Sequence, residues 1–264
     1  MAQPTASSSA SERRQSVRTG VVWDGVRRLL EADAADGQPA RIVDIGGGTG
    51  GFAVPLAELG HAVQVIDPSP DALASLDRRA RERGVADRVT GQQGDLSDLA
   101  DLVDEADLVL CHGVLEMVED PAASLASIAG VLRPGGHLSL LVAQRHAAVV
   151  ARAMAGHFQA ARELLDDAPH RPAGGSADGQ AGQAGPVGRS GRRFTHDEVV
   201  DLLAGAGLDP ESVHAVRVFA DLVPGSLLDL EPGATAALVE LEKAVATRPE
   251  YLPLAAQLHV TARR

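Results

Sequence analysis

Cysteine and lysine are nearly absent from this chain of 264 residues. Cys111 is the only cysteine, which excludes an internal disulfide and a cysteine-rich metal site, and we expect no bound metal. Lys243 is the only lysine, so no lysine stands in a glycine-rich loop, where a phosphate-binding P-loop requires one. P-loop nucleoside triphosphatases are therefore excluded.

Long apolar runs are also missing. No run of about 18 apolar residues occurs, and residues 1–20 contain no apolar core of a signal peptide. We therefore expect a cytoplasmic protein with no membrane contact. The net charge of −12 argues against broad non-specific binding of nucleic acid but is compatible with a local basic patch. Apolar residues make up 45% of the chain, which is typical of a globular enzyme.

Short β-branched runs alternate with helical segments from residue 40 onward, which predicts βαβ units. The expected strands are 40–45, 61–67, 88–95, 106–113 and 134–143, and the expected helices between them are 51–60, 70–84 and 121–132. Two further strands, 212–222 and 256–263, flank a helix at 234–247. The pattern predicts an α/β fold with a doubly wound, mainly parallel seven-stranded sheet that has an antiparallel edge.

The remaining segments indicate how the chain is divided. Residues 1–17 are rich in Ser and Ala and predict a disordered tail, followed by a helix from about 20 to 34. Residues 171–188 are low in complexity and predict a flexible insertion. A helix over 194–208 should begin with a capping box formed by Thr195 and Glu198. We expect one domain over 18–264.

Five glycines occupy six positions in VDIGGGTGGF, residues 43–52, directly after the first strand. Gly46, Gly48 and Gly51 match G-x-G-x-x-G, and Asp67 ends the next strand, as in dinucleotide-binding folds. That match alone is weak. A short-chain dehydrogenase needs a tyrosine followed four residues later by a lysine, but here the only tyrosine follows the only lysine.

Residues 44–50, DIGGGTG, resemble the D-x-G-x-G-x-G signature of class I S-adenosylmethionine-dependent methyltransferases, which have a Rossmann-like fold. The resemblance implies S-adenosylmethionine as cofactor. Asp67 would accept hydrogen bonds from its ribose hydroxyls and Asp95 one from its adenine amino group. Asp44 would accept hydrogen bonds from the loop amides rather than contact the cofactor. Cys111 is expected to be a buried strand residue and not a nucleophile.

Further segments resemble the tRNA 5-carboxymethoxyuridine methyltransferase family, which esterifies the carboxylate of a modified wobble uridine. They include SVRTGVVWDGVRRLL, HGVLEMVEDP, MAGHF, VRVFADL and LHVTARR, and the resemblance runs from about residue 18 to 263. It implies tRNA, through its anticodon loop, as partner. The residues implied to contact the cofactor are Arg18, Gly46, Gly47, Gly48, Asp67, Gly94, Asp95 and His112.

The chain departs from the family in two places. Met117 stands where a tryptophan is usual, and a glycine-rich stretch ending in GRSGRR replaces a lysine-rich segment. Anticodon loops are bound by phosphate contacts and by stacking of splayed bases. The candidates for these contacts are Arg189, Arg192, Arg193 and Phe194, with Phe158 as another stacking residue. The alternative is that these arginines only keep a loop soluble.

An ionised carboxylate needs no base, so catalysis would consist of positioning the acceptor and excluding water. A cation should orient the acceptor carboxylate: Arg217 is the first candidate, and Arg145 with His146 the second. Two alternatives stay open. A methyltransferase of a small-molecule acid or hydroxyl would use His146 or His112 as general base. A non-catalytic protein would bind the cofactor without transferring its methyl group.

Overall fold

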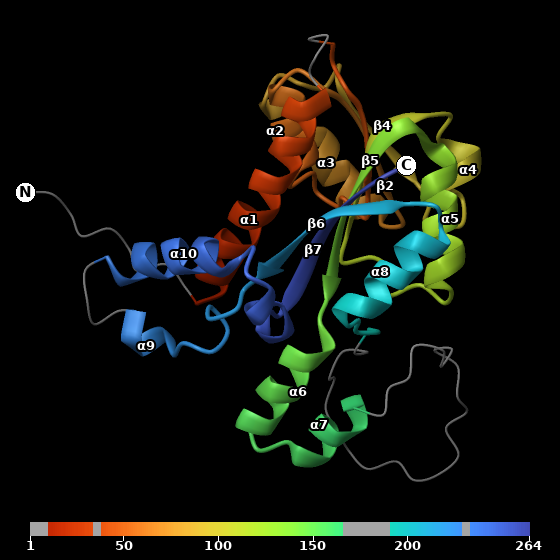
Figure 1. Ribbon diagram of the computed structural model, residues 1–264. Helices are drawn as coiled ribbons and strands as arrows, with labels where there is room; N and C mark the ends of the chain where they lie inside the picture. Colours follow the sequence, from red (N-terminus) through yellow and green to blue (C-terminus); the bar gives the residue numbers. More distant parts are fainter. Residues whose placement is uncertain (1–9, 34–37, 166–190, 229–232) are drawn as a thin grey trace, which may run out of the picture.

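The computed structural model describes residues 10–33, 38–165, 191–228 and 233–264, and it contains a seven-stranded sheet in the order β3-β2-β1-β4-β5-β7-β6 (Figure 1). The strands are β1 (Arg41–Ile45), β2 (Ala62–Asp67), β3 (Val89–Gln93), β4 (Ala106–His112), β5 (Leu132–Ala143), β6 (Asp209–Val216) and β7 (Gln257–Arg263). Strands β1 to β5 are parallel, whereas β7 runs antiparallel to both β5 and β6. The predicted α/β fold and its antiparallel edge are confirmed.

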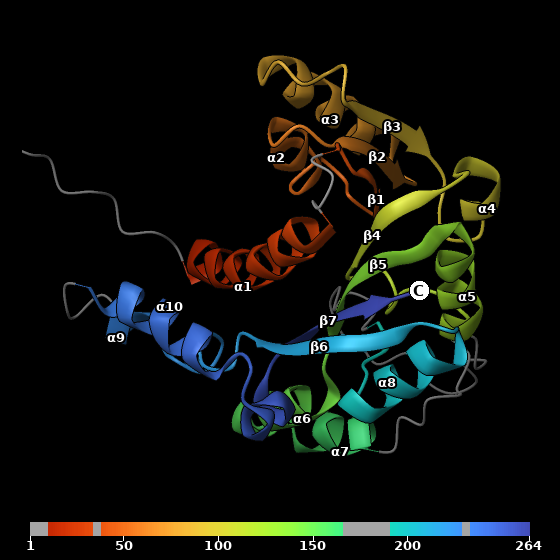
Figure 2. The ribbon, with the colours of Figure 1, turned by 45° about the horizontal axis from the view of Figure 1, so that its top comes forward.

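Helices cover both faces of the sheet (Figures 1 and 2). One face carries α1 (Ala10–Asp33), α2 (Ala53–Glu58) and α3 (Pro70–Glu82), and the other α4 (Leu99–Leu102), α5 (Pro121–Val131) and α8 (His196–Gly205). Each face has its own core: Val26 of α1 packs in a cluster with Ile42 and Val65, and Leu125 of α5 in a cluster with Val109. Because both faces are covered, the central strands are almost continuously apolar.

The remaining helices are α6 (Arg145–Met154), α7 (Phe158–Leu165), α9 (Gly225–Leu228), α10 (Ala234–Val245) and the 3-10 helix η2 (Pro249–Leu254). The pair α6 and α7 extends beyond the sheet from the end of β5 (Figure 1). The sequence analysis assigned no structure to residues 145–165. The capping box of α8 is confirmed, since the Thr195 and Glu198 side chains each accept from the other residue's amide.

Two boundaries differ from the prediction by more than three residues. Residues 10–17, expected in the tail, are helical, because Glu, Arg and Gln favour a helix without needing an apolar face. Residues 1–9 and the predicted insertion at 171–188 lie outside the described residues. Strand β6 ends at Val216 rather than continuing to 222, because the amides of Val218, Phe219 and Ala220 donate to the buried Glu242 carboxylate at 2.7–2.8 Å. No helix in the described part of the chain has the length and apolarity needed to cross a membrane.

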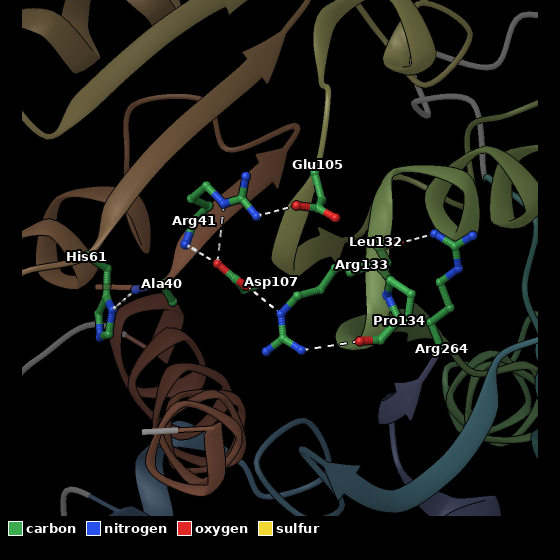
Figure 3. A network of polar contacts seen from close by, with 9 residues as sticks. All are labelled: Ala40, Arg41, His61, Glu105, Asp107, Leu132, Arg133, Pro134 and Arg264. Carbon is green, nitrogen blue, oxygen red and sulfur yellow. Dashed lines mark hydrogen bonds and ion pairs between the residues drawn. The ribbon is translucent and has the colours of Figure 1, made fainter. Parts of the chain in front are cut away.

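Charged side chains join the strands at the amino-terminal edge of the parallel sheet (Figure 3). Asp107 of β4 accepts from the Arg41 amide of β1 at 2.7 Å and from Arg133 Nε of β5 at 2.5 Å. Arg41 also donates to Glu105 at 2.6 Å, and Arg264 donates to the Leu132 carbonyl. These contacts hold this edge together, and the opposite edge carries the glycine-rich loop.

Candidate active site

The carboxyl ends of β1 to β4 bring most of the predicted cofactor residues to one edge of the sheet. Gly46, Gly47 and Gly48 follow β1, Asp67 ends β2, Gly94 and Asp95 follow β3, and His112 ends β4. Ligands bind at this edge in open α/β sheets, near the point where the strand order reverses. Here the order reverses between β1 and β4.

The glycines of the loop are required by the packing of the protein itself. Gly46 has a φ of +67°, and a Cβ there would lie 2.6 Å from Val114 Cγ2. A Cβ on Gly47 would lie 2.4 Å from Asp44 Oδ2. Since contacts under 3.0 Å essentially never occur, side chains at both positions would displace the loop from β1 and from the loop after β4.

The Asp67 side chain, at the end of β2, forms a hydrogen bond to the glycine-rich loop. Its Oδ2 accepts from the Gly48 amide at 3.0 Å, and its Oδ1 accepts from the Ser69 amide at 2.9 Å. The sequence analysis gave the role of amide acceptor to Asp44, but the loop amide of Gly48 is bound by Asp67. A carboxylate has about four acceptor sites, so Asp67 retains capacity for the two ribose hydroxyls.

Asp44 is buried beneath the loop. Burial, together with the negative charge of Asp67, raises the pKa of its carboxyl from 3.8 to about 7. Cys111, one strand along, is also buried, and burial together with Glu116 raises the pKa of its thiol to about 12. The expectation that Cys111 is a structural residue is confirmed, because a neutral buried thiol is not a nucleophile.

Beyond β3, Asp95 and Met117 line a cavity of about 580 Å³ that extends to Pro68 and Val114. The Ser97 amide and hydroxyl donate to Asp95 Oδ1 at 2.7 and 2.5 Å, and these bonds lower the pKa of Asp95. The carboxylate is thus ionised and fixed in direction. Met117 is 65% exposed at this cavity, so a flexible thioether stands where the family usually has an indole.

His112 is half-buried at the end of β4, and its Nε2 lies 2.9 Å from Ser139 Oγ of β5. The same hydroxyl lies 2.8 Å from Nε2 of His259 on β7. The His112 ring packs edge-on to Phe52 of the glycine-rich loop, with centroids 4.9 Å apart.

A second cavity, of about 540 Å³, lies at the same edge of the sheet but beside β5, β7 and β6. Arg152, Arg193, Arg217 and His157 line it together with a single acid, Asp221. Arg217 directly follows β6 with a φ of +59°, a strained conformation for a residue with a Cβ. Its guanidinium lies 3.5 Å from Asp221. We call this the arginine cavity.

Arg217 and Arg193 line the same cavity. Three other residues that the sequence analysis proposed for substrate contacts are placed elsewhere by the structure. Arg145 is buried and donates to Glu198 at 2.8 Å and to the Arg193 carbonyl at 3.0 Å, so it fixes the protein rather than a ligand. Phe194 is 2% exposed within the core and is not accessible to a base. His146 is exposed and does not line the arginine cavity.

The predicted cluster of basic residues is only partly described. Arg192 points away from Arg193, into a separate cavity of about 640 Å³ that contains four acidic residues. Arg189 lies outside the described residues, and only the backbone of Arg18, in α1, is described. The sequence analysis missed Arg152, Ser139 and His259. A basic residue in the apolar run of α6 was the only available signal for Arg152, and the other two carry no motif.

Comparisons with known proteins agree with this geometry. Residues 43–140 match the family model of the methyltransferase domain. The chain is 30% identical over 258 residues to the tRNA 5-carboxymethoxyuridine methyltransferase of Escherichia coli K12, covering 94% of this chain and 88% of the relative. It is 34% identical over 143 residues to a ubiquinone biosynthesis O-methyltransferase of Azorhizobium caulinodans, covering 53% and 56%.

Among solved structures, the fold is similar to that of magnesium protoporphyrin IX methyltransferase from Synechocystis PCC 6803 with bound SAH. The TM-score is 0.62 at 16% identity, and the match covers 99% of this chain and 90% of that one. At this identity the likeness supports the fold alone.

Proposed function

Because the chain belongs to the tRNA 5-carboxymethoxyuridine methyltransferase family of S-adenosylmethionine-dependent methyltransferases, we propose that it methylates the carboxylate of 5-carboxymethoxyuridine at the wobble position of tRNA. The product is the methyl ester. A tRNA substrate also implies that the enzyme works in the cytoplasm. The observation that carries this proposal is the arginine cavity.

The arginine cavity suits an anionic acceptor. Three guanidinium groups and His157 line it against one carboxylate, in a chain whose net charge is −12. The Nε atoms of Arg193 and Arg217 are buried and have no hydrogen-bond partner among the described residues. Burial and the neighbouring Arg152 lower the pKa of Arg193, so a bound anion would relieve both effects. Guanidinium groups bind carboxylates in bidentate geometry.

The position of the arginine cavity also suits the reaction. His112, at the end of β4, pairs in register with Leu141, and Ala143, which lines the cavity, lies two residues further along β5. The cofactor residues at the ends of β1 to β4 and the cavity beside β5 therefore share one edge of the sheet. An acceptor bound by Arg217 would face the cofactor across the β4–β5 boundary.

The residues present fit S-adenosylmethionine, which supplies a methyl group already activated by a sulfonium centre. The glycine-rich loop leaves its backbone open above Asp44, and Asp67 and Asp95 offer oriented carboxylate oxygens to the ribose and the adenine. These acids also provide a negative field for a cationic ligand.

Catalysis then depends on what the chain does to the acceptor. A carboxylate with an ordinary pKa of about 4 is ionised at neutral pH, so no general base is needed. Arg217 would orient it, and the alanines of α6 that line the cavity would exclude water while letting a planar ring approach.

The test is transfer from labelled cofactor to tRNA that carries 5-carboxymethoxyuridine, compared with tRNA that lacks the carboxymethoxy group and with a metabolite extract. Only the first should be labelled, and mild alkali should release the label as methanol. Arg217→Gln should lower kcat/KM by about ten- to a hundredfold, as expected for a lost charged hydrogen bond, with cofactor affinity unchanged.

Arg81→Gln is the matched control, because Arg81 also pairs with an acid four residues away, Asp77, but lies on α3. Its activity should equal that of the wild type. Label that survives alkali, or that appears only in the metabolite extract, would overturn the proposal in favour of a hydroxyl or small-molecule acceptor.

A further inference from the structure

Glu242 of α10 is a buried carboxylate that binds the chain directly after Arg217. Its Oε2 accepts from the Val218 amide at 2.8 Å, and its Oε1 accepts from the amides of Phe219 and Ala220 at 2.8 and 2.7 Å. Successive amides that converge on one carboxylate form an anion-binding nest. One side chain therefore fixes three consecutive residues of the segment that follows β6.

The backbone changes direction at Arg217. In a regular strand, residues two apart in sequence point to the same face of the sheet. Val216 packs in the core cluster of Val26, whereas Val218 packs in the cluster of Leu125, which belongs to the other face. The left-handed φ of +59° at Arg217 lies between them and accounts for the change. Arg217 thereby leaves the alternation of β6 and lines the arginine cavity.

The conformation of Arg217 needs an external contact to stabilise it. A residue with a Cβ is strained at positive φ. The Arg217 carbonyl accepts from the Ala256 amide at 3.1 Å, and the next three amides along the chain donate to Glu242. Each hydrogen bond to a charged group contributes about as much free energy as one strained residue costs, so three of them outweigh the strain. Glu242 thus stabilises a backbone conformation that the residue itself disfavours.

Helix α10 holds the Glu242 carboxylate in a fixed position relative to β6. Just after the helix, the Ala246 carbonyl accepts from the Ala215 amide of β6 at 2.7 Å. Ala246 is buried in the core cluster of Val26, so the end of α10 also packs against α1. The helix is therefore attached to β6 before Arg217 and, through Glu242, to the segment after it.

We propose that Glu242 is a positioning residue that directs the Arg217 side chain into the arginine cavity. It acts through the backbone, because its three hydrogen bonds fix the turn and the turn sets the direction of the guanidinium. The proposal rests on the proposed function in one respect, since that function makes Arg217 the group that orients the acceptor carboxylate. A guanidinium that is already aimed at the acceptor raises the rate, because its orientation need not be found in each turnover.

Proton–nitrogen-15 NMR of the arginine side chains tests the proposal in the full chain without cofactor or tRNA. Nε of Arg217 is buried, so its N–H should exchange slowly with water, and its signal is assigned by its loss in Arg217→Gln. Glu242→Gln has nearly the same shape but replaces one acceptor oxygen by an NH2 group, so at least one amide loses its acceptor. The Arg217 signal should then shift toward those of exposed arginines and exchange about tenfold faster or more.

A second variant and a control accompany this measurement. Glu242→Asp keeps the charge but is one methylene shorter, so it cannot reach all three amides and should shift the Arg217 signal in the same direction. Glu240→Gln is the control, because Glu240 lies on the same helix but is exposed and pairs with Lys243. It should leave the Arg217 signal as in the wild type.

Kinetics with tRNA that carries 5-carboxymethoxyuridine separate positioning from general stability. Glu242→Gln should lower kcat about three- to tenfold, as expected for the loss of one hydrogen bond, with cofactor affinity unchanged. In the Arg217→Gln background the same substitution should have no further effect on kcat, because the guanidinium that Glu242 directs is gone. A purely structural role of Glu242 would lower kcat by the same factor in both backgrounds.

An unchanged Arg217 signal in folded Glu242→Gln or Glu242→Asp would overturn the proposal, and so would equal losses of kcat in the two backgrounds. The NMR result does not depend on any substrate. If no variant methylates tRNA while the Arg217 signal shifts as predicted, the proposed function fails and the role of Glu242 in directing Arg217 stands.

Discussion

At the scale of single residues, Asp44 is expected to lower the free energy of unfolding of the cofactor-free protein. The carboxyl lies beneath Gly47, buried and beside the charge of Asp67, and its pKa is about 7. In the unfolded chain the same group has a pKa near 3.8. Between these values the folded protein holds a proton that the unfolded chain releases.

The sign of the pH dependence follows from this difference. A raised pKa in the folded state gives a contribution to stability that is complete below about pH 4 and is lost as the pH rises through about 7. We predict that Asp44→Asn, which is neutral at every pH, removes this loss and stabilises the cofactor-free protein above pH 7 by up to about 4 kcal/mol.

Urea denaturation at several pH values between 5 and 8.5 measures the effect. Asp77→Asn, at an exposed acid of α3, should follow the wild-type curve. Parallel curves for Asp44→Asn and the wild type would show that Asp44 is not protonated in the fold.

The residues of the site differ in how visible they are in the sequence. The positions of the loop glycines, Asp67 and Asp95 at the carboxyl ends of strands were predictable, because each stands at the end of an apolar strand pattern or directly after one. The roles of Arg145 and Phe194 were not, because their burial depends on contacts between residues 143–145 and residues 193–198, about 50 residues apart in the chain. Ser139 and His259 become partners only through the pairing of β5 with β7, 120 residues apart in the chain.

At the scale of secondary structure, the helices α6 and α7 are the unpredicted elements that complete the site. Val150 and Arg152 line the arginine cavity from α6, and Met154 and Phe158 are 68% and 71% exposed beside it. Proteins that bind single-stranded nucleic acids combine exposed aromatic side chains, on which the bases stack, with cationic side chains that contact the phosphates. The apolar residues that these helices bury, Ala148 and Ala161, are small, so the segment lacks the large core residues on which the sequence analysis relied.

We predict that Phe158→Ala raises the KM for tRNA about tenfold, because stacking of one base on an aromatic ring contributes about 1–3 kcal/mol. Cofactor affinity, and the rate with a free 5-carboxymethoxyuridine nucleoside, should be unchanged, since neither reaches α7. Leu59→Ala is the control, because Leu59 is also largely exposed, at 57%, but lies at the end of α2. A wild-type KM for tRNA in Phe158→Ala would exclude α7 from the tRNA interface.

The position at which β6 ends could not be predicted from the sequence either. The run SVHAVRVFADL reads as one strand, and the break at Arg217 is imposed by Glu242 of α10, which accepts three successive amides. Glu242 stands between Glu240 and Lys243, and the sequence of α10 gave no local sign that only this carboxylate is buried. The same break gives Arg217 its strained backbone and directs it to the arginine cavity.

At the scale of the whole molecule, the two halves of the sheet edge have opposite charge. The acids Asp67 and Asp95 lie at the ends of β2 and β3, where a cationic cofactor would bind, and the arginines gather beside β5 and β6. The chain is strongly acidic as a whole, so its attraction for a polyanion must be local. This division favours a reaction between a cation and an anion that meet at the β4–β5 boundary.

The salt dependence of tRNA binding tests this local attraction. Each phosphate contact to a single strand contributes about 0.7 to the slope of log affinity against log salt, so a few arginines should give a shallow slope. The double substitution Arg152→Gln and Arg193→Gln should lower that slope by about 1.4 and leave cofactor affinity as it was. Arg78→Gln with Arg81→Gln, two exposed arginines of α3, makes the same change in net charge away from the arginine cavity and should leave the slope unaltered. Equal losses in the two double variants would mean that tRNA responds to the overall charge of the protein and not to the arginine cavity.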